Sequence, residues 1–163
     1  MALRKVIFTS ATVAARDLGA AFASAFADGR ISGAAVTLSG ATLGVAKGFL
    51  CAHGRIIENT AALSVALSGS SGVAQLVLVV NVSGEGSVST ALRTAESESA
   101  LAALTQDDIN DGSSTVYEME LALVDLSEGT LLRSAGMAAR PLYVVSEAPE
   151  DGAADGIYFV VEE

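Results

Sequence analysis

The chain's only cysteine and only histidine stand two positions apart, in the stretch CAHGR at residues 51–55. A thiolate activated by an imidazole is the pair that many nucleophilic enzymes use, and both groups are also zinc ligands. If residues 45–53 form one strand, its odd-numbered side chains share a face, and Cys51 and His53 lie roughly 6.5 to 7 Å apart along it. That separation is too long for a direct hydrogen bond, and the chain has no other cysteine or histidine to complete a zinc site. The sequence therefore favours a packing pair at the end of a strand, close to a turn.

An acidic stretch at residues 107–118, DDINDGSSTVYE, partly matches a calcium-binding loop. Aspartate stands at its first and fifth places, glycine at the sixth and glutamate at the twelfth, but Ile109 occupies the third place, where an oxygen ligand belongs. Neither flank has the pattern of the long helices of an EF-hand. The sequence therefore predicts no metal site of this type, and it leaves Asp107, Asp108 and Asp111 as candidates for a looser calcium site or for stabilising turns.

Two glutamates, Glu118 and Glu120, project from one face of a strand predicted at residues 116–126. Carboxylates roughly 7 Å apart can serve as the acid and base of a glycosidase. The chain has no tryptophan and three tyrosines with which to build a sugar platform, so a solvated strand face is the favoured interpretation. Nucleophile elbow, P-loop and dinucleotide-binding glycine motifs are absent from the sequence as well. We therefore expect a protein that is not an enzyme and that uses no cofactor.

Composition and charge argue against several further classes of function. The chain has 163 residues, of which 51% are hydrophobic and 17% charged, as expected of one folded domain. No stretch approaches the roughly 20 unbroken apolar residues of a membrane helix, and the apolar run after Arg4 and Lys5 ends too early for a signal peptide. The net charge of −10 repels phosphate backbones. We expect neither nucleic acid nor a membrane as a partner.

The charge is unevenly spread along the chain. Residues 1–60 carry six basic and three acidic side chains, which leaves three basic and sixteen acidic ones for the remainder. A mildly basic first part and a strongly acidic second part would favour head-to-tail contacts between copies, although solvated surface charge accounts for the same pattern.

The spacing of apolar residues predicts one amphipathic helix at residues 11–28. Leu18, Phe22 and Phe26 follow one another at four-residue spacing, and Gly29 is placed to end the helix. This apolar stripe serves either the protein's own core or contact with another copy of the chain. The three side chains are therefore candidates for an oligomer contact.

After Gly29 the pattern changes to short segments of β-branched residues and leucine, separated by glycine, serine and asparagine. We predict strands at residues 34–38, 43–52, 55–57, 62–67, 75–82, 87–93, 116–126, 142–146 and 157–161. Turns at intervals of about 8 to 12 residues are typical of all-β domains. The predicted fold is mainly β, an antiparallel β-sandwich or barrel-like domain with one N-terminal amphipathic α-helix.

We expect these elements to form a single domain over residues 1–163. Its β-rich body covers residues 34–146, with one short helical turn within 98–104. Two similar strands around an acidic loop predict a terminal β-hairpin at residues 140–163.

The order of the elements resembles the amino-terminal domain of bacteriophage baseplate upper proteins and tail-fibre attachment proteins. The similarity covers about residues 12–134 and lies in the segments FADGRISG, VAKGFLCAHGRIIENTAALSVAL, AQLVLVVNVS, ALRTAES and VYEMELALVDLSEGT. These are strand and turn patterns without a catalytic signature. The chain departs from the family at residues 74–76, where members often carry an arginine and an aspartate, and it ends in RPLYVVSEAPEDGAADGIYFVVEE where members continue into a long fibre or receptor-binding region.

The resemblance implies a non-enzymatic virion structural protein, a baseplate or tail-fibre component of a phage or prophage that acts through protein–protein contacts. Its partners would be copies of itself, as a homotrimer or another homo-oligomer, and other tail or baseplate proteins. It would reside in the virion, and in the host cytoplasm before assembly. An alternative is a ligand-binding β-module for a surface glycan or calcium, motivated by the acidic loops at residues 107–111 and 150–155.

Three residues within the similar segments are predicted to shape turns. Gly54 permits a tight turn, and Arg55 then begins a strand, where it forms an ion pair or caps carbonyl groups. Asn59 suits a hairpin turn because asparagine tolerates a positive φ.

Overall fold

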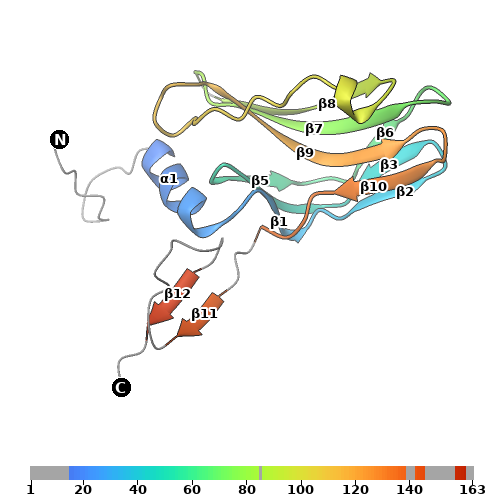
Figure 1. The fold of residues 1–163 in the computed structure, drawn as a ribbon. Coiled ribbons are helices and arrows are strands. Elements are labelled where there is room, and N and C mark those ends of the chain that lie inside the picture. Colours follow the sequence, from blue (N-terminus) through green and yellow to red (C-terminus); the bar gives the residue numbers. More distant parts are fainter. Residues whose placement is uncertain (1–14, 85, 139–141, 146–156, 161–163) are drawn as a thin grey trace.

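The computed structural model describes residues 15–84, 86–138, 142–145 and 157–160, and Figure 1 shows how their elements are arranged. Two antiparallel β-layers stack face to face, and helix α1 (Ala15–Ala25) lies at one end of them. This arrangement confirms the predicted mainly β sandwich with one helix near the N-terminus. No helix in the described part of the chain is long and apolar enough to cross a membrane.

The first layer consists of six short strands in two three-stranded sheets. Their bounds are β1 (Gly29–Gly33), β2 (Val36–Ser39), β3 (Thr42–Val45), β4 (Gly48–Ala52), β5 (Arg55–Asn59) and β6 (Leu63–Ala66). The sheet β1-β4-β5 continues into the sheet β2-β3-β6, because β1 leads into β2, β3 into β4, and β5 into β6. The layer is therefore one three-stranded meander in which every strand is broken once, at residues 34–35, 46–47 and 60–62.

The breaks lie beside one another and are joined by backbone hydrogen bonds. Ala34 N–H donates to Lys47 O at 2.8 Å, and Ala46 N–H donates to Ala35 O at 2.9 Å. Ala34 has a φ of 49°, a left-handed conformation that interrupts an extended backbone. The segment 43–52, predicted as one strand, therefore forms both β3 and β4.

The break also overturns the prediction that the odd-numbered residues from 45 to 53 share one face. Val45 and Cys51 are buried, whereas the side chain of Phe49 between them is exposed. Alternation holds only while the backbone stays extended, and two non-strand residues separate β3 from β4.

Asn59, at the end of β5, stabilises the break between β3 and β4. Its side-chain amide donates to Ala46 O at 2.7 Å, and the same nitrogen lies 3.4 Å from Val45 O. Asn59 is not among the residues with a positive φ, so the prediction that it shapes a hairpin turn was wrong. Its amide instead satisfies carbonyl groups where the strands have separated.

The second layer is a four-stranded antiparallel sheet with the order β10-β9-β7-β8. Its strands are β7 (Val73–Asn81), β8 (Ser87–Ala95), β9 (Val116–Asp125) and β10 (Thr130–Ser134). Between β8 and β9 the short 3₁₀ helix η1 (Glu98–Ala100) occupies part of the predicted helical turn. The sequence pattern missed β10 and β1, which are both five residues long, and β1 contains two glycines and one serine.

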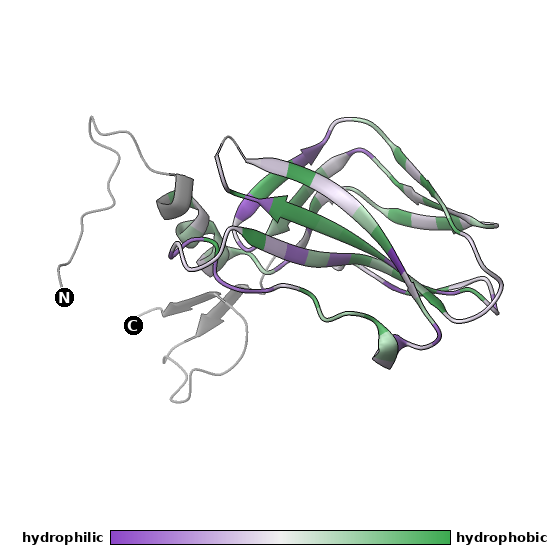
Figure 2. Cartoon of the chain, turned by 90° about the horizontal axis from the view of Figure 1, so that it is seen from above, coloured by the Kyte–Doolittle hydropathy of each residue, from purple (hydrophilic) through white to green (hydrophobic). Residues whose placement is uncertain are grey.

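The core lies between the two layers. Leu43 and Leu50 of the first layer belong to the same buried cluster as Leu76, Leu78 and Leu121 of the second. Figure 2 shows β7 as an almost uninterrupted hydrophobic strand between neighbours of mixed character. This is the pattern expected of a central strand that is covered on both faces.

The last two strands, β11 (Leu142–Val145) and β12 (Ile157–Val160), pair in parallel. The predicted terminal hairpin was therefore wrong, because a hairpin requires antiparallel strands. The two strands have similar sequences, but similarity of sequence does not fix the direction in which two strands pair. The connecting residues 146–156 and their acidic loop lie outside the described residues.

Helix α1 ends before the predicted limit of residue 28. Phe26 N–H closes the last turn by donating to Phe22 O at 2.8 Å, and the next amide, of Ala27, donates to Ala138 O at 2.9 Å. The amide of Ala27 thus donates to a carbonyl group outside the helix, and the helix ends there. The predicted first residues of the helix, 11–14, fall outside the described ranges.

Candidate functional site

Cys51 has the environment of a structural residue. It lies in β4, is fully buried, and its pKa is raised, chiefly by burial. Because the thiolate is the nucleophilic form, a buried thiol with a raised pKa is unreactive at neutral pH. The structure thus places Cys51 away from any exposed reactive site.

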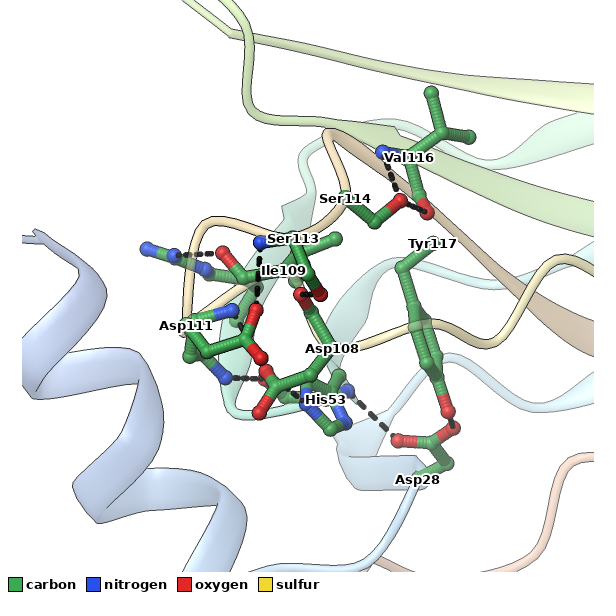
Figure 3. Close-up of polar contacts among 11 residues, drawn as sticks. Asp28, His53, Asp108, Ile109, Asp111, Ser113, Ser114, Val116 and Tyr117 are labelled. Atoms are coloured by element: carbon green, nitrogen blue, oxygen red, sulfur yellow. Dashed lines mark hydrogen bonds and ion pairs between the residues drawn. The ribbon is translucent and has the colours of Figure 1, made fainter.

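His53 occupies the turn that joins β4 to β5, and Figure 3 shows its surroundings. His53 and Gly54 have φ values of 45° and 75°, the positive pair that a two-residue type I′ hairpin turn requires. The imidazole Nε2 lies 2.8 Å from Asp108 Oδ1, and the ring stacks on Tyr117 with 4.9 Å between ring centroids. His53 is therefore a polar junction as well as a packing residue.

Asp28 connects the same turn to β9. Its Oδ1 accepts the backbone N–H of His53 at 2.7 Å, and its Oδ2 accepts the Tyr117 hydroxyl at 2.7 Å (Figure 3). Burial, together with the hydrogen bond to the Asp28 carboxylate, raises the pKa of Tyr117 well above its usual range. Neither Asp28 nor Tyr117 was singled out by the sequence, because 89 positions separate them.

The acidic candidates of the loop before β9 stabilise turns. Asp108 Oδ1 accepts the N–H of Asn110 at 2.7 Å, and Asp111 Oδ1 accepts the N–H of Ser113 at 2.6 Å. The bond from Asn110, followed by that from His53, lowers the pKa of Asp108. Asp107 is exposed. Where side chains are described, no group of three or more acidic, histidine or cysteine residues is arranged to hold a metal ion.

Together these contacts tie three segments into one unit. Asn110 adds a further link, since its side-chain amide donates to His53 O at 3.0 Å. Within the described residues, the only side-chain partner of His53 Nε2 is the Asp108 carboxylate, and no hydroxyl or thiol stands where an imidazole base would activate it. The cluster formed by Asp28, His53, Asp108, Asn110 and Tyr117, called the turn cluster below, is therefore built to position backbone.

Gly54 allows helix α1 to approach the β4–β5 turn. A Cβ at Gly54 would lie 1.9 Å from Gly19 O and 2.5 Å from Ala23 N, both in α1. The next residue, Arg55, directs Nη2 toward Ile109 O at 3.5 Å, so it caps a carbonyl group, one of the two roles predicted for it. The pair thus joins the helix, the hairpin and the loop before β9.

Two of the three predicted oligomer-contact residues, Leu18 and Phe22, lie against the protein's own hairpin. Leu18 and Phe22 line a hollow of about 200 Å³ whose other walls include Gly54 and Ile56. The rings of Phe22 and Phe26 are tilted, with centroids 6.2 Å apart. Phe22 and Phe26 are half-buried and Leu18 remains 38% exposed, so the stripe packs within the chain and still presents apolar surface.

The two glutamates of β9 do not form a solvated face, contrary to the sequence-based interpretation. Glu118 is 7% exposed, and its Oε1 accepts Arg93 Nη2 at 2.5 Å while Oε2 accepts the N–H of Thr105 at 2.9 Å. Burial alone would raise the pKa of Glu118, but these bonds lower it overall. The segment around Thr105 covers this face of the sheet, which the strand pattern did not indicate.

Glu120 is also engaged. Its carboxylate forms two hydrogen bonds with the guanidinium of Arg133, at 2.5 and 3.0 Å, and accepts Gln75 Nε2 at 2.6 Å. Although burial opposes the change, these partners lower its pKa. Both carboxylates are therefore held ionised by arginine, which leaves neither as the protonated acid that a glycosidase needs.

An open cleft lies between the two layers. It has a volume of about 480 Å³ and is bounded by β5 and β6 on one side and by β8 on the other. Each of these strands is the edge of its sheet and has a single strand partner within the described residues. The walls include Ile56, 42% exposed, and Val88, 49% exposed, while core residues form the floor. The sequence pattern did not predict this cleft, because it depends on which edges of two sheets meet.

Comparisons with protein-family models, with curated proteins and with solved structures found no match.

Proposed function

We propose that this protein is a non-enzymatic structural component of a phage or prophage tail, a baseplate or tail-fibre protein that acts through protein–protein contacts. The proposal rests on one structural observation, the cleft whose two rims are unpaired sheet edges within the described residues. An exposed sheet edge offers a row of backbone donors and acceptors, and a second chain can pair with it. The similarity of the sequence to phage attachment domains supports the same function.

The state of the candidate catalytic groups also supports a role in assembly. Cys51 is buried, His53 is joined to Asp108, and Glu118 and Glu120 are paired with arginines. Each group has a structural environment that accounts for its position. Partners of the protein are then further copies of itself, as a trimer or another homo-oligomer, and neighbouring tail proteins.

Light scattering after size-exclusion chromatography tests this function. The full chain is measured at moderate salt over a range of concentrations, with calcium and with a chelator. We expect a stable oligomer of the same mass in both buffers. A monomer at every concentration would contradict self-assembly. A mass or melting temperature that changes with millimolar calcium would favour the ligand-binding module, because a ligand of the native state stabilises it.

A further inference from the structure

We infer that the cleft between β5, β6 and β8 binds residues 3–10 of a second copy of the chain as an added β-strand. This inference rests on the proposed function, because it names the contact through which copies assemble. There are two alternatives: the chain's own residues 3–10 occupy the cleft, or the cleft stays empty. A cross-linking experiment distinguishes them from docking between copies.

The acceptor edge is well suited to strand addition. β8 is nine residues long and pairs with β7 along its whole length, which leaves its other edge open within the described residues. Residues 87–92 of β8 contain no charged residue and no proline. Natural sheet edges usually carry such residues to prevent pairing, so this stretch of the β8 edge lacks the common protection.

Exposed apolar side chains extend from the cleft to the hollows beside it. Ile56 lines both the 480 Å³ cleft and the smaller hollow beside Leu18 and Phe22 of α1. Ile56 and Val88 also border a third depression near the turn between β7 and β8. Exposed apolar surface that is continuous over several elements marks an interaction site more often than scattered single residues do.

The segment that precedes α1 has the composition of a strand. Residues 3–10 read LRKVIFTS, with four consecutive strand-forming residues from Val6 to Thr9. In an extended strand Arg4, Val6 and Phe8 share one face, so two apolar side chains can enter the cleft beside one cation. Eight residues span about 26 Å, and residues 11–14 remain as a connection to α1.

Charge favours this occupant over another part of the chain. Residues 1–14 contain Arg4 and Lys5 and no acidic residue, whereas the rest of the chain has seven basic and nineteen acidic side chains. Glu58 is exposed on β5 and lines the cleft. A basic segment is therefore drawn to the acidic body of another copy, and the cleft offers a carboxylate at its rim. Each copy then contributes both a donor strand and an acceptor cleft, a head-to-tail arrangement that closes into a ring when the rotation allows.

Cysteine cross-linking in the full chain tests the docking. One variant carries Val6→Cys and another carries Ser89→Cys, which lies in the cleft wall on β8. Cys51 stays in both variants because it is buried. A mixture of the two variants is oxidised, and a matched mixture replaces the second variant with Glu128→Cys, an exposed position in the turn between β9 and β10. We expect a cross-linked dimer in the first mixture and a loss of that dimer in the control.

Other results would overturn the inference in distinguishable ways. Cross-linking within a single chain of a Val6→Cys/Ser89→Cys variant, with none in the mixture, would assign the cleft to the chain's own segment. An oligomer seen by light scattering with no cross-link in either format would reject the docking and leave the proposed function standing. A chain that is monomeric by light scattering and forms no cross-link would reject both.

A charge exchange gives a second readout that does not depend on added cysteines. Glu58→Arg should weaken the association by roughly fivefold, as expected for the loss of an exposed charge pair. Adding Arg4→Glu to this variant should restore the association, whereas Glu128→Arg should leave the association unchanged. Equal weakening by Glu58→Arg and Glu128→Arg would show a general charge effect and contradict docking at the cleft.

Discussion

The Tyr117 hydroxyl donates a hydrogen bond of 2.7 Å to Asp28 across 89 positions of sequence. The same carboxylate accepts the backbone N–H of His53, so it joins β9 to the β4–β5 turn. One aspartate between the helix and β1 thus fixes how the two layers meet at the end where α1 packs.

Replacing Tyr117 with phenylalanine removes this link without changing the shape of the side chain. We expect the free energy of unfolding to fall by about 1 to 2 kcal/mol at neutral pH, because Asp28 loses a partner in a partly buried site. Urea denaturation measures the change. In a cycle with Asp28→Ala, the two losses should not add, since both changes break the same bond.

The pH dependence of stability provides the control for this variant. The folded pKa of Tyr117 is raised above its ordinary value of about 10, so the unfolded state releases its proton first as the pH rises. The stability contributed by Tyr117 is therefore complete below pH 10 and is lost as the pH rises above it. The wild-type protein should lose stability more steeply there than Tyr117→Phe, and equal slopes would contradict the assignment.

Glu118→Gln should destabilise the protein by about 1.5 to 3 kcal/mol at neutral pH, because the buried carboxylate accepts charge-assisted bonds from Arg93 and the Thr105 amide. The folded pKa of Glu118 is lowered, so its stabilisation is present above the ordinary value of 4.5 and disappears as the pH falls below that value. The difference between wild type and variant should therefore shrink in acid. Glu128→Gln, in an exposed turn, is the matched control and should change little.

Gly54→Ala should cost at least about 3 kcal/mol or prevent folding. The added methyl group would collide with the backbone of Gly19 and Ala23, and the φ of 75° is itself unfavourable for alanine. Gly112→Ala separates the two causes, since Gly112 has a φ of 86° and no neighbouring atom within 4 Å of the place that the added methyl group would occupy. Its expected cost is about 1 to 2 kcal/mol. Similar losses for both variants in thermal or urea unfolding would show that α1 does not pack closely on the turn.

Cys51 should resist alkylation by iodoacetamide in the folded protein at neutral pH and react fully after denaturation. Burial keeps the reagent away and raises the thiol pKa, so little thiolate forms. Mass spectrometry of the intact chain measures the extent of reaction. Rapid labelling of the native protein would show that β4 is accessible and that the thiol deserves study as a reactive group.

Local sequence pattern was sufficient for the fold class and for most strands. Alternating and continuous apolar runs identified β7 and β9, and the helical spacing of Leu18 and Phe22 identified α1. Such patterns depend only on residues that are close together in the sequence. The tight turn predicted at Gly54 is also such a local feature, and the structure contains it.

The remaining features depend on contacts between distant parts of the chain. Asn59 binds carbonyl groups at a break 13 positions away, and the turn cluster joins Asp28, His53 and Tyr117 from separate segments. No periodicity encodes these pairs. The parallel direction of β11 and β12 and the cleft beside β8 likewise follow from the three-dimensional course of the chain.

The alignment of the three strand breaks constrains how this sequence can vary. Residues 34–35, 46–47 and 60–62 lie beside one another, and the Asn59 amide reaches from one strand to the break in the next. An insertion in one strand, between its break and the next turn, would displace that break relative to the breaks of the neighbouring strands. It would also change the pairing register on one side of the break and not on the other. Length changes in homologous sequences should therefore concentrate in the turns, while the strand segments between each break and the next turn keep their lengths.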